Sequence, residues 1–239
     1  MEPIKKILFC EGRFFAWKKG DLHTAFGMLK EQRIKKAKVT LESNIGKRFK
    51  ILKPTILDLF LKAQRGPQII LPKDIGLILL GTGIDKHSIV LEAGTGSGFL
   101  TCHLARFVKK VISYERRNEF LKIAKNNAQL LGLKNITFKE QDVYKEIKEK
   151  NLDLVVLDVS EPEKAADHAL HALKQGGYFV VYLPTINQVM HFLKNIEQNF
   201  FVLKVVELLE RQWHVEQMRV RPQSHMIAHT GFLCFLRKV

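Results

Sequence analysis

The segment from residue 89 to residue 115 constrains the fold of this chain more than any other. It begins with the apolar run Ile89-Val90-Leu91, which does not alternate with polar residues and is typical of a buried parallel strand. A glycine-rich turn follows, and residues 99–107 then place apolar side chains at helical spacing. Residues 111–114 form a second apolar run that ends at Glu115. This order predicts a β-α-β unit, and therefore an α/β fold with a parallel sheet.

The turn carries one acid and three glycines in the pattern "EAGTGSG", residues 92–98. Glycines let the backbone approach a ligand closely, and an acid about 20 residues further on can accept hydrogen bonds from ribose hydroxyls. A dinucleotide fingerprint would need a glycine at position 99, where this chain has Phe99. The pattern instead resembles the S-adenosylmethionine (SAM) loop of Rossmann-like methyltransferases. The resemblance predicts a set of cofactor-binding residues, which comprises Glu92, Gly94, Gly96, Ser97, Gly98 and Glu115. A glycine-rich turn without a ligand is the alternative.

Two further acids follow predicted strands. Asp142-Val143 comes after the strand at 136–139, and in such methyltransferases an acid here accepts the adenine amino group while its apolar neighbour packs on the ring. Asp158 ends the fourth strand, beside the predicted methyl donor, and is the candidate catalytic acid and a cofactor contact. The Pro-Pro signature of many amino-group methyltransferases is absent, because the sequence after Asp158 reads Val-Ser-Glu-Pro. For both acids, a role as a helix N-cap is the alternative.

The remaining segments complete a Rossmann-like α/β fold with a mostly parallel seven-stranded sheet. Strands are expected at 89–92, 111–114, 136–139, 154–157 and 178–182, and an antiparallel terminal pair at 203–209 and 229–236. Helices are expected at 54–66 and 72–84. Residues 1–50 read as a small β-domain, with hairpin turns at Glu11-Gly12 and Lys19-Gly20, and residues 51–239 as the catalytic domain.

Composition bounds the partners. No run reaches 18 apolar residues and no signal peptide is recognisable, so a membrane span is not expected. Cys10, Cys102 and Cys234 lie far apart, which argues against zinc and for a reducing, cytoplasmic setting; Cys102 and Cys234 read as buried apolar residues. No histidine spacing suggests a metal. The net charge of +15 suggests a polyanionic partner, RNA or DNA, with a solvated basic surface as the alternative.

Several motifs together resemble the tRNA (adenine-N1)-methyltransferase family. They are "QRGPQIILPKDIG", "EAGTGSG", "LDVSEPEKA", "GGYFVVYLPTINQV" and "MRVRPQSHMIAHTGFLCFLRK". The resemblance implies SAM-dependent methylation of adenosine 58 in the tRNA T-loop, with 57 as an additional target in archaeal members, and a homotetramer in prokaryotes.

The resemblance also carries over residue by residue. It implies that Glu115 binds ribose, Asp142 binds adenine and Asp158 is catalytic, and it places Gln68 at the border of the active site. Leu71 departs from the family, which often has tyrosine or histidine there to stack on the target base. Tyr182 is the substitute candidate for stacking, unless it only packs in the core. Arg219 and Arg221 are candidates for phosphate contacts near the site, or else surface or subunit-contact residues.

Two other functions compete with this reading. A small-molecule methyltransferase fits the fold but leaves the positive charge and the C-terminal motif unexplained. A non-catalytic tRNA-binding subunit would be marked by decay of the glycine loop or of Asp158, and both are intact.

Overall fold

The computed structural model describes residues 4–55, 58, 69–196, 200–216 and 218–239. The chain divides into two compact units, one of residues 1–64 with 129–132 and the other of residues 65–128 with 133–239. The helix expected at 54–66 falls almost wholly outside the described residues.

The smaller unit contains a four-stranded antiparallel sheet in the order β2-β1-β6-β5. Its strands are β1 (Lys6–Cys10), β2 (Arg13–Trp17), β5 (Thr40–Glu42) and β6 (Arg48–Leu52). Glu11 and Gly12 join β1 to β2 with positive φ angles of 45° and 78°, the geometry of a type I′ hairpin turn, so the hairpin predicted there is confirmed.

The second hairpin predicted in this unit is wrong. β3 (Leu22–Thr24) pairs with β4 (Gly27–Leu29) and not with β2. The indole N–H of the buried Trp17 donates to the carbonyl of Gly20 at 2.8 Å, so the chain turns away from the sheet there. A short helix, α1 (Glu31–Lys36), follows β4.

The larger unit is built on a seven-stranded sheet in the order β12-β15-β11-β10-β7-β8-β9. Five neighbouring strands run parallel and match the predicted positions: β7 (Ile89–Ala93), β8 (Lys110–Glu115), β9 (Ile136–Glu140), β10 (Leu152–Leu157) and β11 (Leu173–Leu183). β15 (Phe232–Lys238) is antiparallel to both β11 and β12 (Phe200–Glu207), which confirms the terminal pair. The predicted Rossmann-like methyltransferase sheet is therefore present.

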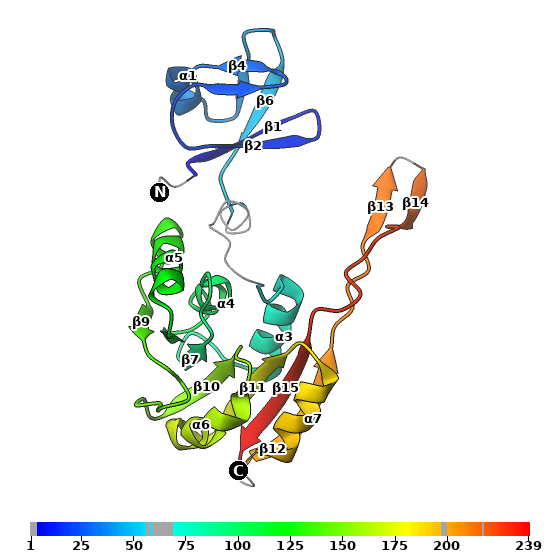
Figure 1. Cartoon of the computed structure of the whole chain (residues 1–239). Coiled ribbons are helices and arrows are strands. Elements are labelled where there is room, and N and C mark those ends of the chain that lie inside the picture. The colour runs from blue at the N-terminus through cyan, green and yellow to red at the C-terminus, as the bar shows by residue number, and fades with distance from the viewer. Residues whose placement is uncertain (1–3, 56–57, 59–68, 197–199, 217) are drawn as a thin grey trace. The chain divides into compact units, whose positions relative to one another are not determined.

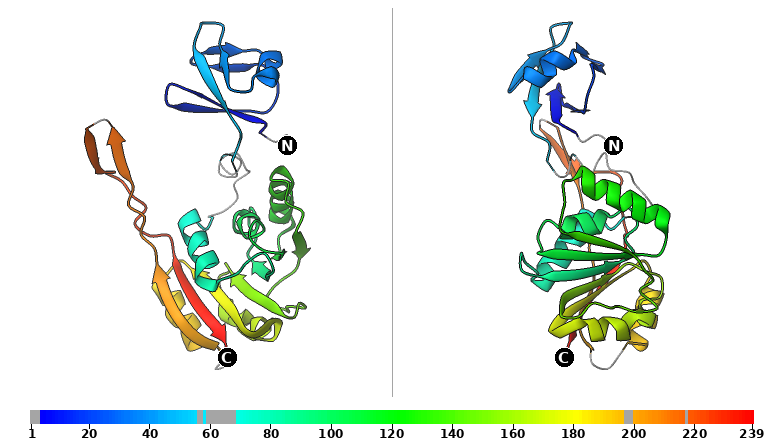
Figure 2. Two further views of the ribbon diagram at one scale, coloured as in Figure 1. Left: turned by 180° about the vertical axis from the view of Figure 1, so that it is seen from behind. Right: turned by 90° about the vertical axis from the view of Figure 1, so that its left-hand side faces the viewer.

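Helices cover both faces of this sheet, as Figures 1 and 2 show. α3 (Pro72–Thr82) and α4 (Phe99–Leu104) contribute to the apolar cluster on one face. The cluster on the opposite face combines strand residues that point to that side with α6 (Ala166–Ala172) and α7 (Ile186–Lys194). The 3₁₀ turn η1 (Pro162–Ala165) leads into α6. α5 (Asn118–Leu130) connects β8 to β9. α4 is three residues shorter than the helix expected at 99–107, because residues 105–107 continue as a turn.

The described cysteines are all buried and free, which confirms the reading of Cys102 and Cys234 as buried residues. Among the described residues no helix is long and apolar enough to span a bilayer.

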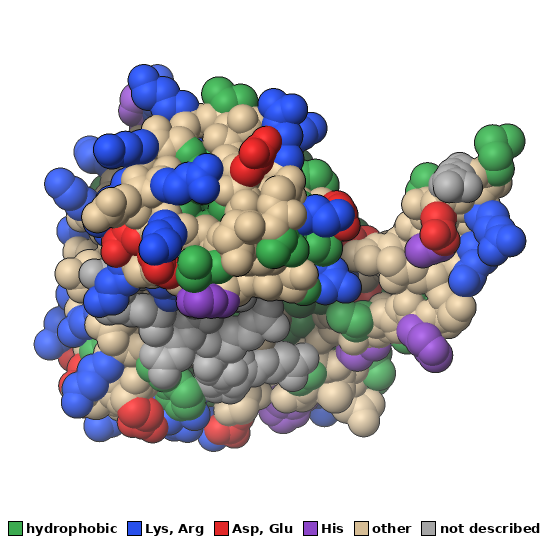
Figure 3. Space-filling view, turned by 90° about the horizontal axis from the view of Figure 1, so that it is seen from above, with side chains coloured by type: hydrophobic (Ala, Val, Ile, Leu, Met, Phe, Trp, Pro, Cys, Tyr) green, Lys and Arg blue, Asp and Glu red, His purple; other side chains and the backbone are tan. Residues whose placement is uncertain are grey.

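A hairpin absent from the sequence prediction interrupts the terminal pair. β13 (Trp213–Glu216) pairs with β14 (Arg219–Pro222), and Figure 1 shows them extending away from the seven-stranded sheet. Every described residue from 209 to 229 is exposed. Several of these are large and apolar, and Figure 3 shows hydrophobic side chains at the far end of the projection.

Candidate active site

The glycine loop links β7 to α4 in a conformation that requires glycine. Gly94 has a φ of +94°, and a Cβ added there would lie 2.0 Å from the backbone oxygen of Asp158. Gly98 has a φ of +77°, and its Cβ would lie 2.9 Å from that of Ala124 on α5. The carbonyl of the buried Ser97 accepts a 2.9 Å hydrogen bond from Asn127 Nδ2. The loop is thus clamped between the end of β10 and α5, with no room for side chains at Gly94 and Gly98.

Glu92 lies fully buried beneath this loop. One carboxylate oxygen, Oε2, accepts hydrogen bonds of 2.8 Å from each of the hydroxyls of Thr101 and Ser113. The other, Oε1, has no partner among the described residues. Burial is the largest influence on this group and raises the pKa of Glu92 to about 7. A cationic ligand above the loop would suit this unsatisfied oxygen, so the site fits the ammonium and sulfonium groups of SAM.

Glu115 ends β8 beside the loop. Its Oε2 accepts a 3.0 Å hydrogen bond from the Gly96 backbone N–H, and its Oε1 accepts one of 3.1 Å from the Arg117 N–H. The guanidinium of Arg117 also pairs with this carboxylate at 3.3 Å. The carboxylate is buried and held in place, at the position expected for a ribose acceptor.

Asp142 and Val143 follow β9. The Asp142 side chain accepts a 3.0 Å hydrogen bond from the Tyr144 N–H, and Val143 is buried. Residues 143–145 form a turn and no helix starts there, so the N-cap alternative for Asp142 is wrong.

Asp158 follows β10, and its backbone N–H donates to the Ala93 carbonyl at 2.9 Å. The N-cap positions of η1 and α6 are occupied by Glu161 and Ala165, so the helix-cap alternative for Asp158 is also wrong. Burial raises the pKa of Asp158 to about 7, although the side chain retains some exposure towards the pocket.

Glu115, Asp142 and Asp158 meet at one pocket of about 190 Å³ at the carboxyl ends of the parallel strands. It is lined by residues that include Gly94, Glu115, Asp142, Val143 and Asp158. The buried Glu92 and the loop residues Gly96, Ser97 and Gly98 are not among its lining residues. Open α/β sheets bind ligands at this edge, in the crevice at the topological switch point where the strand order reverses. Five of the predicted site residues, from four different segments, are thereby brought together.

Other predicted site residues lie elsewhere. Gln68 is outside the described residues. Arg219 and Arg221 are exposed on β14, and neither lines this pocket. Both arginines therefore occupy surface positions outside this pocket.

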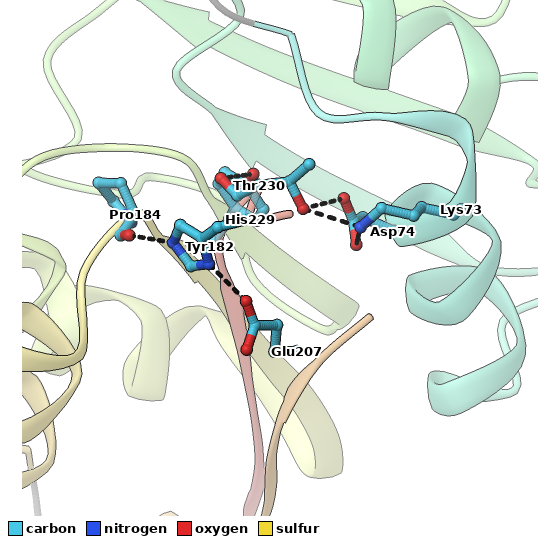
Figure 4. Close-up of polar contacts among 7 residues, drawn as sticks. All are labelled: Lys73, Asp74, Tyr182, Pro184, Glu207, His229 and Thr230. Carbon is cyan, nitrogen blue, oxygen red and sulfur yellow. Dashed lines mark hydrogen bonds and ion pairs between the residues drawn. The ribbon is translucent and has the colours of Figure 1, made fainter. Parts of the chain in front are cut away.

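Tyr182 is buried in the core, and its hydroxyl donates to the Thr230 carbonyl at 2.5 Å. Figure 4 shows how this tyrosine joins a polar network that sequence reasoning missed. The Thr230 hydroxyl donates to Asp74 Oδ2 at 3.1 Å, and the Lys73 ammonium contacts both Thr230 and Asp74 at 2.8 Å. Tyr182 therefore packs in the core, as the alternative to base stacking proposed, because its ring is buried and its hydroxyl is hydrogen-bonded to Thr230.

His229, next to this network, ties the start of β15 to two other segments. Its Nδ1 lies 2.5 Å from Glu207 on β12, and its Nε2 lies 2.6 Å from the carbonyl of Pro184 after β11. Both partners are acceptors, so the ring binds best as a doubly protonated cation, and the bond to Glu207 raises the pKa of His229. The base of the projecting hairpin is thus fixed to the sheet.

A second cavity, of about 610 Å³, lies between α3 and the base of the hairpin. It is lined by Leu71, Lys73, Met226 and Ile227, among others.

No group of three or more His, Cys, Asp or Glu side chains in the described part of the chain could hold a metal ion.

A glycine loop clamped at a parallel sheet edge, with acids after three successive strands, defines a SAM-dependent methyltransferase. Comparison with known proteins narrows the class. The profile of the family described as "tRNA methyltransferase complex GCD14 subunit" matches residues 49–230. The chain therefore belongs to this tRNA methyltransferase family, and the resemblance seen in the sequence is confirmed.

Individual relatives agree with this assignment. The chain is 35% identical to the tRNA (adenine(57)-N(1)/adenine(58)-N(1))-methyltransferase TrmI of Methanocaldococcus jannaschii, over 83% of this chain and 82% of that protein. It superposes on the crystal structure of the tRNA (m1A58) methyltransferase TrmI of Aquifex aeolicus with a TM-score of 0.86 and 32% identity, covering 100% and 98% of the two chains. A crystal structure described as a SAM-dependent O-methyltransferase from Thermotoga maritima matches with a TM-score of 0.90 and 32% identity, covering 100% and 94%.

Proposed function

We propose that this protein transfers a methyl group from SAM to N1 of adenine 58 in the T-loop of tRNA, and that adenine 57 is an additional target. The observation that carries the proposal is the pocket in which Glu115, Asp142 and Asp158 meet the glycine loop, in a chain of this tRNA methyltransferase family. The dual position follows the archaeal relative, whose name specifies both 57 and 58.

Different residues of the pocket and loop bind different parts of SAM. Glu115 accepts hydrogen bonds from the ribose hydroxyls, Asp142 accepts one from the adenine amino group, and the buried Val143 supports the adenine ring. The loop residues Gly94, Gly96, Ser97 and Gly98 pass close to the amino-acid part, and Glu92 beneath them compensates its positive charge. SAM supplies an electrophilic methyl group on a cationic sulfur.

Asp158 is the catalytic acid of this proposal. Adenine N1 already carries a lone pair, so the reaction needs alignment more than a strong base. The ring becomes cationic on methylation, and a carboxylate beside N1 and N6 stabilises that charge and orients the amine. The close approach of Gly94 to the Asp158 backbone fixes this carboxylate relative to the cofactor loop. Because N1 is engaged in tertiary pairing in the T-loop, the base is extracted before it reacts.

The tRNA partner accounts for the charge of +15. Arg219 and Arg221 lie outside the pocket but on an exposed strand, where they can contact phosphates remote from the target base. Arg221→Ala should then lower the affinity for all tRNAs alike, since phosphate contacts do not read sequence. Selective loss of one tRNA would instead indicate base recognition.

The proposed assembly is a cytoplasmic homotetramer. The β13–β14 hairpin supports it, because Trp213, Val215, Met218 and Val220 are each more than half exposed in the single chain. An apolar strand pair of this kind is expected to be covered by another subunit. Light scattering should give four chains for the wild type and fewer for Trp213→Glu, whereas an unchanged mass would exclude the hairpin as the contact.

Nucleoside mass spectrometry tests the activity. Unmodified tRNA incubated with SAM and the purified protein should yield N1-methyladenosine. An oxygen-methylated nucleoside would favour the chemistry named for the Thermotoga maritima structure. Binding of tRNA and SAM without any methylated product would favour the non-catalytic subunit.

A further inference from the structure

The sheet of the smaller unit has two unlike faces. One face, which carries Leu8, Phe15 and Phe49, packs into the core of this unit. The alternating residues of the other face form a row across three strands, because Phe9 on β1 stands opposite both Phe14 on β2 and Lys50 on β6. We refer to this row of Phe9, Phe14 and Lys50 as the aromatic row.

The aromatic row presents a ring to solvent. Phe14 is 65% exposed, and its ring centroid lies 4.8 Å from that of Phe9, which is partly buried. Both rings flank the tight Glu11-Gly12 turn, so their strands are held in a fixed register. The Phe9 ring lies beside the Phe14 ring on the neighbouring strand, with the two planes tilted by 46°, and Phe14 is not part of the buried core of this unit.

The surroundings of the aromatic row are strongly basic. Residues 4–55 contain 14 Lys and Arg against 4 Asp and Glu, a net charge of +10. On this face Arg48 and Lys50 are exposed, while Glu11 is already paired with Lys47 at 2.6 Å and Glu42 stands opposite Arg48. An approaching polyanion therefore meets exposed cations and a flat aromatic surface together.

We propose that the aromatic row is a second RNA contact, at which an unpaired nucleobase of the tRNA stacks on Phe14 while Lys50 and Arg48 bind the adjoining phosphates. This inference rests on the proposed tRNA substrate. Exposed rings on a basic sheet bind unpaired bases because every base has a stacking face, and the cations hold the backbone. A second copy of the chain is a poorer occupant, since two faces of the same positive charge repel each other.

Substitutions at Phe14 separate stacking from simple burial of apolar area. Phe14→Leu keeps an apolar side chain but removes the ring, and Phe14→Tyr keeps the ring. We expect Phe14→Leu to raise the Kd for tRNA by about 5- to 100-fold, as loss of one stacked base would, and Phe14→Tyr to stay within about twofold of the wild type. Val39→Ala is the matched control, because Val39 is 71% exposed in the same unit and lies outside the aromatic row.

Methylation kinetics with the full chain locate the effect. Phe14→Leu should raise the KM for tRNA while leaving the turnover number and the Kd for SAM unchanged, because the residue is outside the catalytic pocket. Lys50→Ala should lower the slope of log affinity against log salt by about 0.7 to 0.9. Circular dichroism checks that each variant is folded.

Three results would overturn the inference. The first is a tRNA Kd for Phe14→Leu equal to that of Val39→Ala. The second is an equal loss of tRNA affinity in Phe14→Leu and Phe14→Tyr. The third is a change of oligomeric mass in Phe14→Leu, which would assign the face to a second copy of the chain. Failure of the proposed function would look different, because the wild-type protein itself would then not methylate tRNA.

Discussion

Replacing Gly94 with alanine should disrupt the site far more than the same change two residues away. A Cβ at Gly94 would lie 2.0 Å from the Asp158 carbonyl oxygen, whereas a Cβ at Gly96 meets nothing closer than 3.9 Å. Both residues have positive φ, +94° and +52°, so both substitutions carry backbone strain of about 1–2 kcal/mol. The steric clash is specific to Gly94.

The size of this difference follows from the geometry. Real Cβ contacts begin near 3.0 Å, so the end of β10 would have to move by about 1 Å, and overpacking of this kind costs about 1–3 kcal/mol. The displacement would also stretch the 2.9 Å bond from the Asp158 N–H to Ala93 and move the catalytic carboxylate. We expect Gly94→Ala to lose about 2–5 kcal/mol of unfolding free energy, and Gly96→Ala about 1–2 kcal/mol.

Urea unfolding followed by far-UV circular dichroism measures these losses without cofactor, and calorimetry then gives the SAM affinity of the folded variants. Gly94→Ala should bind SAM weakly and be nearly inactive. Equal stability losses in the two variants, or a SAM Kd for Gly94→Ala within threefold of the wild type, would refute the proposed clamp between the loop and β10.

Four further predictions concern the pocket carboxylates. Glu115→Ala removes charge-assisted hydrogen bonds worth about 1.5–3 kcal/mol, so calorimetry should show SAM binding about 10- to 150-fold weaker; unchanged affinity would reject its role. Asp158→Asn should keep SAM and tRNA binding but lower single-turnover methylation by about 10²–10³-fold, and a rate within threefold of the wild type would reassign the acid. The pKa of Asp158 is raised to about 7, so the wild-type rate should rise with pH up to an inflection at or below about 7, because bound SAM is cationic and favours the carboxylate. Without SAM, burial raises the pKa of Asp158 above its ordinary value near 4, so ionisation of Asp158 destabilises the folded chain as pH rises from about 4 to about 7. Thermal melts at pH 8 without SAM should therefore find Asp158→Asn more stable than the wild type.

Much of the catalytic fold could be predicted because its information is local. Buried parallel strands are uninterrupted apolar runs, and each acid directly follows one, so Glu115, Asp142 and Asp158 had to meet at one sheet edge. The sequence pattern could not decide whether an acid caps a helix, since that depends on whether a helix begins at the residue after it. The turn after Asp142 and the positions of Glu161 and Ala165 decided it.

Features that depend on distant residues were missed. The Asp74–Thr230 bond joins positions 156 residues apart, and no periodicity marks it. The β13–β14 hairpin has alternating residues but no buried face, so its pattern gave no core signal. Alternation in the first strands indicates that Phe14 and Phe15 point to opposite faces, but only the structure shows that Phe14 is left exposed.

Primer extension across the T-loop tests the central claim most directly. A methyl group at N1 blocks the Watson–Crick edge of adenine, so reverse transcriptase stops beside each modified base. Unmodified tRNA treated with the wild-type protein and SAM should give a strong new stop at position 58, a further one at 57, and neither with Asp158→Asn. Full-length extension through both positions after treatment with the folded wild-type protein would contradict the account.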